Sequence, residues 1–125
     1  MKRVINTPLA PKPVGPYSQA IEANGTLYVA GQIAIIPSSG EIAEGFTAQA
    51  HQVFKNIGEI LREAGYSYDD VVKTTVLLDN IADSAEMSAI YATYFSAIPQ
   101  PARSCFEVAK LPLGVLIEVE VIATK

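Results

Sequence analysis

Arginine, cysteine and glutamate alternate along one short segment of the chain, and their chemistry suits the handling of a carboxylate. Arg103, Cys105 and Glu107 recur at every second position of residues 102–108, and Glu118 follows in the next apolar segment. A guanidinium offers a planar pair of donors to a carboxylate, and a second carboxylate nearby can orient or deprotonate water. The pattern predicts an anion-binding arginine and a proton-handling glutamate. A cross-strand Arg–Glu ion pair that only ties the sheet together fits the same pattern, so the residues alone leave both interpretations open.

The single cysteine and the single histidine point to neither a metal site nor a thiol nucleophile. One residue of each kind cannot supply the several ligands of a usual zinc site. His51 lies off the apolar stripe of its predicted helix, so we expect it to face solvent and not to reach Cys105. We therefore expect Cys105 to be a small buried strand residue. No glycine-rich phosphate loop occurs, and the sequence predicts no metal and no cofactor.

Tyr17 is a further candidate for a binding site. It follows Gly15-Pro16 and precedes Ser18. A rigid turn flanked by proline can hold a phenol at the mouth of a pocket. The same ring could equally pack the loop onto a sheet.

Two helices are predicted to position these residues. Apolar side chains repeat every 3.6 residues from 44 to 64, which indicates a long amphipathic helix ending at Gly65. Asp83 is expected to begin a second helix, with Glu86 completing a capping box, and two prolines near residue 100 end it.

The remaining periodic segments predict strands at 20–23, 26–30, 71–78, 102–108 and 115–124. Asn24-Gly25 favours a hairpin turn between the first two. Two helices and this set of strands predict an α+β domain over residues 1–125, with both helices on one face of the sheet.

The last predicted strand has two unlike faces. Residues at odd positions from 115 to 123 are apolar, whereas Glu118 and Glu120 share the other face with two apolar residues. A mixed face of this kind suits a subunit interface that contains pockets. If the apolar residues of 102–108 pack under the helices, Arg103 and Cys105 share this open face with Glu118.

Composition narrows the class of protein. Half of the 125 residues are hydrophobic, and 9 basic against 13 acidic residues give a net charge of -4. This charge disfavours binding to nucleic acid, and no apolar run is long enough to span a bilayer. Residues 1–19 contain four prolines and no apolar core of a signal peptide, and one cysteine cannot form an internal disulfide. We expect a reducing, cytoplasmic compartment.

Five motifs occur in order along essentially the whole chain: Gly15-Pro16-Tyr17-Ser18-Gln19, Ala30-Gly31-Gln32-Ile33, Pro101-Ala102-Arg103-Ser104-Cys105-Phe106-Glu107-Val108-Ala109, Leu111-Pro112 and Ile117-Glu118-Val119-Glu120. Together they closely resemble the RidA family, also called the YjgF family. The resemblance implies a chorismate-mutase-like subunit with a mixed β-sheet, assembled as a homotrimer with a ligand pocket between adjacent subunits.

The resemblance also implies an activity, that of a reactive intermediate deaminase. Such enzymes hydrolyse enamines and imines, such as 2-aminoacrylate and 2-iminobutanoate, to 2-oxoacids and ammonia. Their substrates are released by pyridoxal-phosphate-dependent serine and threonine dehydratases. The hydrolysis itself needs no cofactor.

Site roles follow from the resemblance residue by residue. It implies that Arg103 binds the substrate carboxylate together with the backbone at Cys105, and that Glu118 positions the attacking water. Tyr17 and the backbone of Gly31 are expected to line the pocket.

Two residues depart from the pattern of the family. Ser88 stands where many members carry asparagine, and Ala30 stands where some carry serine. These departures keep a second possibility open, a regulatory trimer that binds a 2-oxoacid without turnover. An endoribonuclease or translation inhibitor is a weaker alternative, because the chain is acidic and has no basic cluster interleaved with aromatics.

Overall fold

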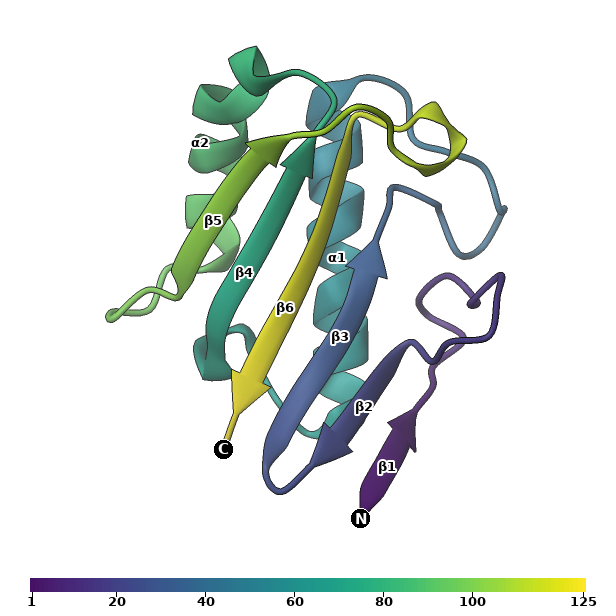
Figure 1. Cartoon of the computed structure of the whole chain (residues 1–125), viewed down its shortest axis with the longest axis vertical. Helices are drawn as coiled ribbons and strands as arrows, with labels where there is room; N and C mark the ends of the chain where they lie inside the picture. Colours follow the sequence, from purple (N-terminus) through teal and green to yellow (C-terminus); the bar gives the residue numbers. More distant parts are fainter.

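Six strands form one mixed sheet in the order β1-β2-β3-β6-β4-β5 (Figure 1). The computed structural model describes residues 1–125. The strands are β1 (Lys2–Ile5), β2 (Ala20–Ala23), β3 (Thr26–Gln32), β4 (Val71–Leu78), β5 (Ala102–Glu107) and β6 (Ile117–Thr124). All neighbours are antiparallel except β4 and β5, which are parallel. A parallel pair needs a crossover connection, and the second helix provides it.

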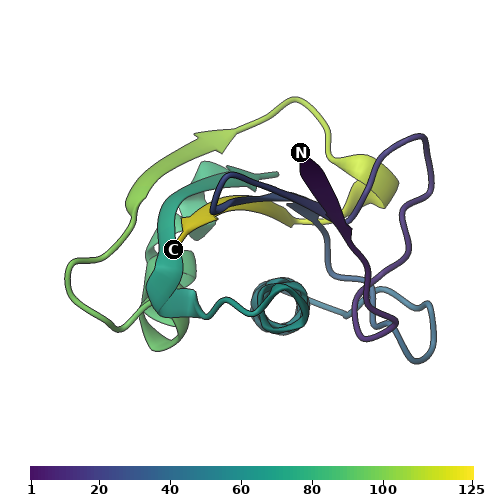
Figure 2. The ribbon, with the colours of Figure 1, turned by 90° about the horizontal axis from the view of Figure 1, so that it is seen from below.

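Helices α1 (Phe46–Ala64) and α2 (Ser84–Tyr94) lie on the same side of the sheet (Figure 2). Three short 3-10 helices complete the structure: η1 (Tyr68–Asp70), η2 (Ile81–Asp83) and η3 (Pro112–Gly114). Helix α1 ends at Gly65 in the left-handed conformation, with a φ of 84° that favours glycine. The predicted α+β arrangement, with both helices on one face, is confirmed. Neither helix is long and apolar enough to cross a membrane.

The core lies between the helices and the inner face of the sheet. The apolar stripe of α1 packs there on Ile117, Val119 and Val121 of the central strand β6, all of them buried. Burying an apolar side chain of this size stabilises a fold by about 1.5–3 kcal/mol. Residues 118, 120 and 122 of β6 consequently face the other side of the sheet, as the alternation predicts.

Neither α1 nor α2 covers the outer face of the sheet (Figure 2). An apolar row crosses it from strand to strand, formed by Val4, Ile21, Tyr28 and Ile122. Val4 and Tyr28 are exposed in this row, and Phe106 on β5 is 55% exposed on the same face. Since Glu118 and Glu120 also lie here, the predicted mixed character of this face is confirmed.

One strand is missed and one local prediction is wrong. The sequence pattern does not reveal strand β1, because it is an edge strand with only Ile5 buried and shows no alternation. The capping box at Asp83 does not form, since Asp83 already has helical angles at the end of η2. Asn80 caps this turn instead by accepting from the Ala82 N–H at 2.9 Å, while the Glu86 carboxylate accepts from the Thr47 hydroxyl.

Candidate functional site

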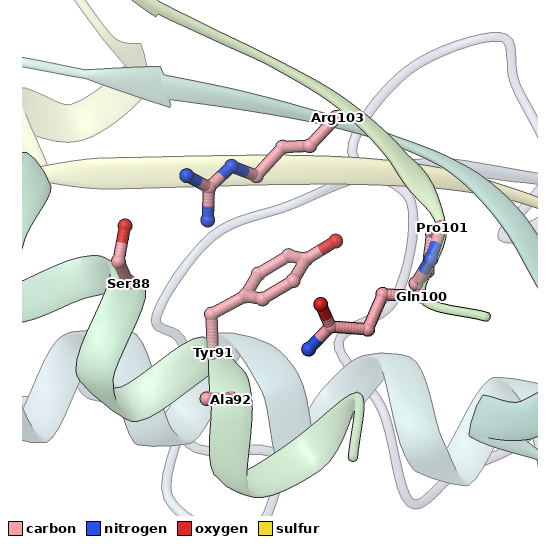
Figure 3. A pocket seen from close by; sticks show the side chains of 6 residues that line it. All are labelled: Ser88, Tyr91, Ala92, Gln100, Pro101 and Arg103. Carbon is pink, nitrogen blue, oxygen red and sulfur yellow. The ribbon is translucent and has the colours of Figure 1, made fainter. Parts of the chain in front are cut away.

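Arg103 lies on the inner face of β5 and points toward α2. Its guanidinium carbon is 4.9 Å from the centre of the Tyr91 ring (Figure 3). In the parallel β4–β5 pair it stands beside Thr74, whose side chain is fully buried under the helices. Cys105, two residues on, packs against the same core. The expectation that Arg103 and Cys105 share the open face with Glu118 is therefore wrong.

The register explains this correction. Cys105 pairs with Val76 and through it with Val119, and both valines are buried on the inner face. Phe106 lies in the row of Glu118 on the outer face. One aromatic residue in an edge strand does not reveal which face is inner, because an edge strand buries little on either side.

A cavity of about 430 Å³ surrounds the guanidinium, and we call it the arginine pocket. It is lined by Ser88, Tyr91, Ala92, Gln100, Pro101 and Arg103 (Figure 3). The Arg103 side chain forms neither of the two ion pairs of the protein, which are Arg3–Glu22 and Arg62–Glu59. Its donors are thus available to an anionic ligand.

A second cavity of about 760 Å³ lies between the 11–19 segment, the end of β3, η3 and β6, and we call it the glutamate pocket. It brings together three of the residues expected in the site, Tyr17, Gly31 and Glu118. Ala30, one of the two departures from the family pattern, lines it as well. Ser88, the other departure, lines the arginine pocket instead.

Gly31 and Glu118 meet at a β-bulge. The β3–β6 pairing shifts by one residue between Val29 and Gln32, which takes Gly31 out of the regular ladder. A Cβ atom at Gly31 would overlap the Glu118 carboxylate, so a larger residue there would have to displace the Glu118 side chain. Burial raises the pKa of Glu118 above its usual value of 4.5, and the neighbouring Glu120 raises it further.

The wall that carries Tyr17 is held by Gln19, a buried residue to which the sequence analysis gave no role. Its Oε1 accepts from the Thr7 N–H at 2.7 Å. Its Nε2 donates to the carbonyls of Thr7, Ala10 and Pro11 at 3.0, 3.3 and 3.0 Å. One side chain thereby fixes the loop that borders the pocket. The Tyr17 ring itself is half exposed.

Two buried amides of α1 hold the other walls of the glutamate pocket. Asn56 Nδ2 donates to the carbonyls of Ile33 and Ile35 at 3.2 and 3.0 Å. Gln49 Oε1 accepts from the Leu116 N–H at 2.8 Å, just before β6. The sequence signal for these two roles was a polar residue inside the apolar stripe of a helix, since a buried amide needs hydrogen-bond partners.

Cys105 and His51 lack the environment of a nucleophile and its base. Burial raises the pKa of the Cys105 thiol, and the opposing effect of Arg103 is smaller. His51 is half-buried and its Nδ1 lies 2.8 Å from the Tyr94 hydroxyl, which differs from the solvent-facing histidine that we expected. His51 thus packs against Tyr94 of α2.

The two pockets lie on different sides of the sheet. Arg103 faces α2 on the inner side, whereas Glu118 faces outward between β3 and β4. Within one chain the arginine and the glutamate do not meet.

Known proteins match the chain along its whole length. The family model described as endoribonuclease L-PSP matches residues 7–125. A RutC family protein of Pyrococcus horikoshii is 53% identical, covering 100% of this chain and 99% of that protein. The chloroplastic Reactive Intermediate Deaminase A of Arabidopsis thaliana is 48% identical, covering 98% of this chain and 66% of that protein. The chain belongs to the RidA family. The family membership predicted from the motifs is thus confirmed.

Other similar members of the RidA family include a protein named for its activity and proteins with solved structures. A mouse protein named 2-iminobutanoate/2-iminopropanoate deaminase is 44% identical over 100% of this chain and 93% of its own length. A Rid family protein of Yersinia pestis superposes with a TM-score of 0.97 at 48% identity, covering 100% of both chains. Escherichia coli TdcF, solved with bound serine, has a TM-score of 0.93 at 34% identity and covers 98% of both chains.

Proposed function

We propose that the protein hydrolyses enamine and imine intermediates, such as 2-aminoacrylate and 2-iminobutanoate, to 2-oxoacids and ammonia. The observation that carries the proposal is a guanidinium without an acidic partner, held open in a pocket of its own. Such a group suits the carboxylate that every one of these substrates carries. The name of the mouse relative and the serine bound to TdcF support the same class of ligand.

The proposed site forms between subunits of a homotrimer. Strand β5 is an edge of the sheet, so the arginine pocket lies at the rim of the subunit. The outer face offers an apolar row and the glutamate pocket. A neighbouring copy seated on this face would cover the exposed apolar side chains and bring its Arg103 to the glutamate pocket. The expected assembly has a mass of about 40 kDa, three times the chain mass of 13.4 kDa.

The chemistry needs orientation and one proton-handling group. Arg103 would bind the substrate carboxylate through two parallel hydrogen bonds, with the backbone at Cys105 as a further contact. Glu118 would hold the water that adds to C2 of the imine, while Tyr17 and Gly31 enclose the substrate. A proton then moves to nitrogen, and the C2–N bond of the carbinolamine breaks to release ammonia and leave the 2-oxoacid. Because burial raises its pKa, Glu118 is a stronger proton acceptor than an exposed glutamate and would accept the proton and return it.

The substrates imply functional partners. Pyridoxal-phosphate-dependent dehydratases release enamines from serine and threonine, so we place the protein beside them in the cytoplasm. The proposed hydrolysis uses water alone as co-reactant and no cofactor.

A coupled assay tests the proposal. Purified protein is added to a threonine dehydratase reaction, and imine decay is followed beside the appearance of 2-oxobutanoate. We expect faster imine decay with wild type and no acceleration with Arg103→Ala. Binding of 2-oxobutanoate without acceleration would instead identify a regulatory trimer. Cleavage of an RNA probe that survives Arg103→Ala would favour the activity after which the family model is named.

A further inference from the structure

We propose that Tyr91, held by Thr74, is a positioning residue that orients the Arg103 guanidinium for a carboxylate ligand. This inference rests on the proposed function of Arg103. The ring centre lies 4.9 Å from the guanidinium carbon, within the distance of about 6 Å over which a cation is attracted to an aromatic face (Figure 3). Arg103 is exposed on an edge strand, so little else restricts its long side chain.

Tyr91 can orient its neighbour because its own position is fixed. Its side chain is buried and packs edge-on against Phe54, with ring centres 5.9 Å apart and planes at 82°. The Phe95 ring lies 4.5 Å away on another side. The ring is therefore a rigid platform built into the core.

Thr74 fixes the polar end of the platform. Its Oγ1 lies 2.9 Å from the Tyr91 hydroxyl, and the threonine is fully buried. Thr74 is also the β4 partner of Arg103 in the parallel ladder. The two residues thus stand side by side on neighbouring strands, and the phenol ring reaches from one to the other.

Stacking on a ring leaves the guanidinium free to bind. The guanidinium carbon lies over the ring face, and an aromatic face attracts the cation without supplying a carboxylate that would take up its N–H donors. An acidic neighbour would hold Arg103 equally well but would occupy the donors that a carboxylate ligand needs. In Figure 3 the Ser88 hydroxyl points toward the same space, which is the open side of the arginine pocket.

The test compares Tyr91→Leu with Tyr94→Leu, a matched control that removes a ring of the same helix not stacked on Arg103. For Tyr91→Leu we expect the Kd of 2-oxobutanoate and the KM of the imine to rise about tenfold, with kcat at saturation within about threefold of wild type. Tyr91→Phe keeps the ring but loses the hydrogen bond to Thr74, so its Kd should rise less than that of Tyr91→Leu. Equal behaviour of the two leucine variants would overturn the proposal.

A spectroscopic readout separates orientation from simple stability. The chain has three arginines, Arg3, Arg62 and Arg103, so ¹⁵N–¹H spectra of the Nε groups are readily assigned by substitution. We expect the Arg103 signal to be shifted by the ring current in wild type and Tyr91→Phe. Thr74→Val and Tyr91→Phe, which both remove the hydrogen bond between Thr74 and Tyr91, should increase the mobility of the Arg103 side chain on the ps–ns timescale. If Tyr91→Leu does not fold, unchanged Arg103 mobility in Thr74→Val overturns the proposal.

The Arg103 and Tyr91 variants distinguish failure of this inference from failure of the proposed function. If Arg103→Ala abolishes binding of 2-oxobutanoate while Tyr91→Leu leaves it unchanged, only the role of Tyr91 is rejected. If Arg103→Ala binds 2-oxobutanoate as wild type does, both proposals are rejected.

Discussion

Gly31 lies so close to the carboxylate of Glu118 that a methyl group at residue 31 would overlap it. Gly31 does not adopt a positive φ, so alanine is compatible with its backbone. The glycine therefore leaves room for the Glu118 carboxylate in its present position, and the chain conformation does not require it. Because of this contact, a substitution at residue 31 is expected to move the Glu118 side chain.

Gly31→Ala should displace the Glu118 side chain and lower kcat by about 10- to 100-fold, because small misplacements of a catalytic group are costly. Steady-state assays of imine hydrolysis measure the loss. The same substitution in a Glu118→Gln background should cause little further loss, since the group that it displaces is already altered. Additive losses would show that Gly31 acts independently of Glu118.

Arg103→Lys should be nearly as damaging as Arg103→Ala, with kcat/KM reduced about 100-fold or more. An ammonium is a point charge and does not reproduce two parallel hydrogen bonds to a carboxylate. Arg62→Lys is the matched control, because Arg62 is exposed on α1 and pairs only with Glu59. Retention of most activity by the Arg103 lysine variant would contradict bidentate binding.

Glu118→Gln should lower kcat by about 10²–10⁴-fold while the Kd of 2-oxobutanoate stays within a few fold, as expected for a group that handles a proton in the transition state. The acid limb of kcat/KM should lie above pH 4.5, because burial raises the pKa of Glu118. Glu120→Gln removes the second cause of that shift and should move the limb to lower pH. A catalytically dead Glu120→Gln with an active Glu118→Gln would reverse the assignment.

Folding stability should depend on pH through the same carboxyl group. A pKa that is higher in the folded state means that the folded chain binds more protons than the unfolded chain once the pH exceeds 4.5. The stabilisation is therefore complete below that pH and is lost as the pH rises through the folded pKa. Denaturant titrations should show wild type losing stability relative to Glu118→Gln over this window. A constant difference between the two proteins would argue against a raised pKa.

Cys105→Ala should retain at least about half of the wild-type activity. The Cys105 thiol has a raised pKa because of burial, and direct attack by water needs no nucleophilic side chain. Cys105→Ser, which keeps the size and a weak donor, should behave alike. Complete loss of turnover in a folded Cys105→Ala protein would indicate covalent catalysis.

The sequence predicted those features that depend on a pattern within one element. The stripe of α1 could be read from its 3.6-residue spacing, and the strand Val71–Leu78 from its run of β-branched and apolar residues. The face of β5 on which Arg103 lies could not be read from the sequence, since only its pairing with Thr74 in the parallel ladder shows which face is inner. The role of Gln19 was equally hidden, because its partners lie 8–12 residues away in an irregular loop.

The place of β6 in the sheet has a consequence for how the chain acquires its structure. Residues 117–124 lie between β3, formed by residues 26–32, and β4, formed by residues 71–78. On the ribosome, the backbone edges of these two strands that face each other stay unpaired until the strand that joins them has been synthesised. Pairings between such distant segments also slow folding, since long loops must close before the contacts form. The strand that carries Glu118 is thus the one on which completion of the sheet depends.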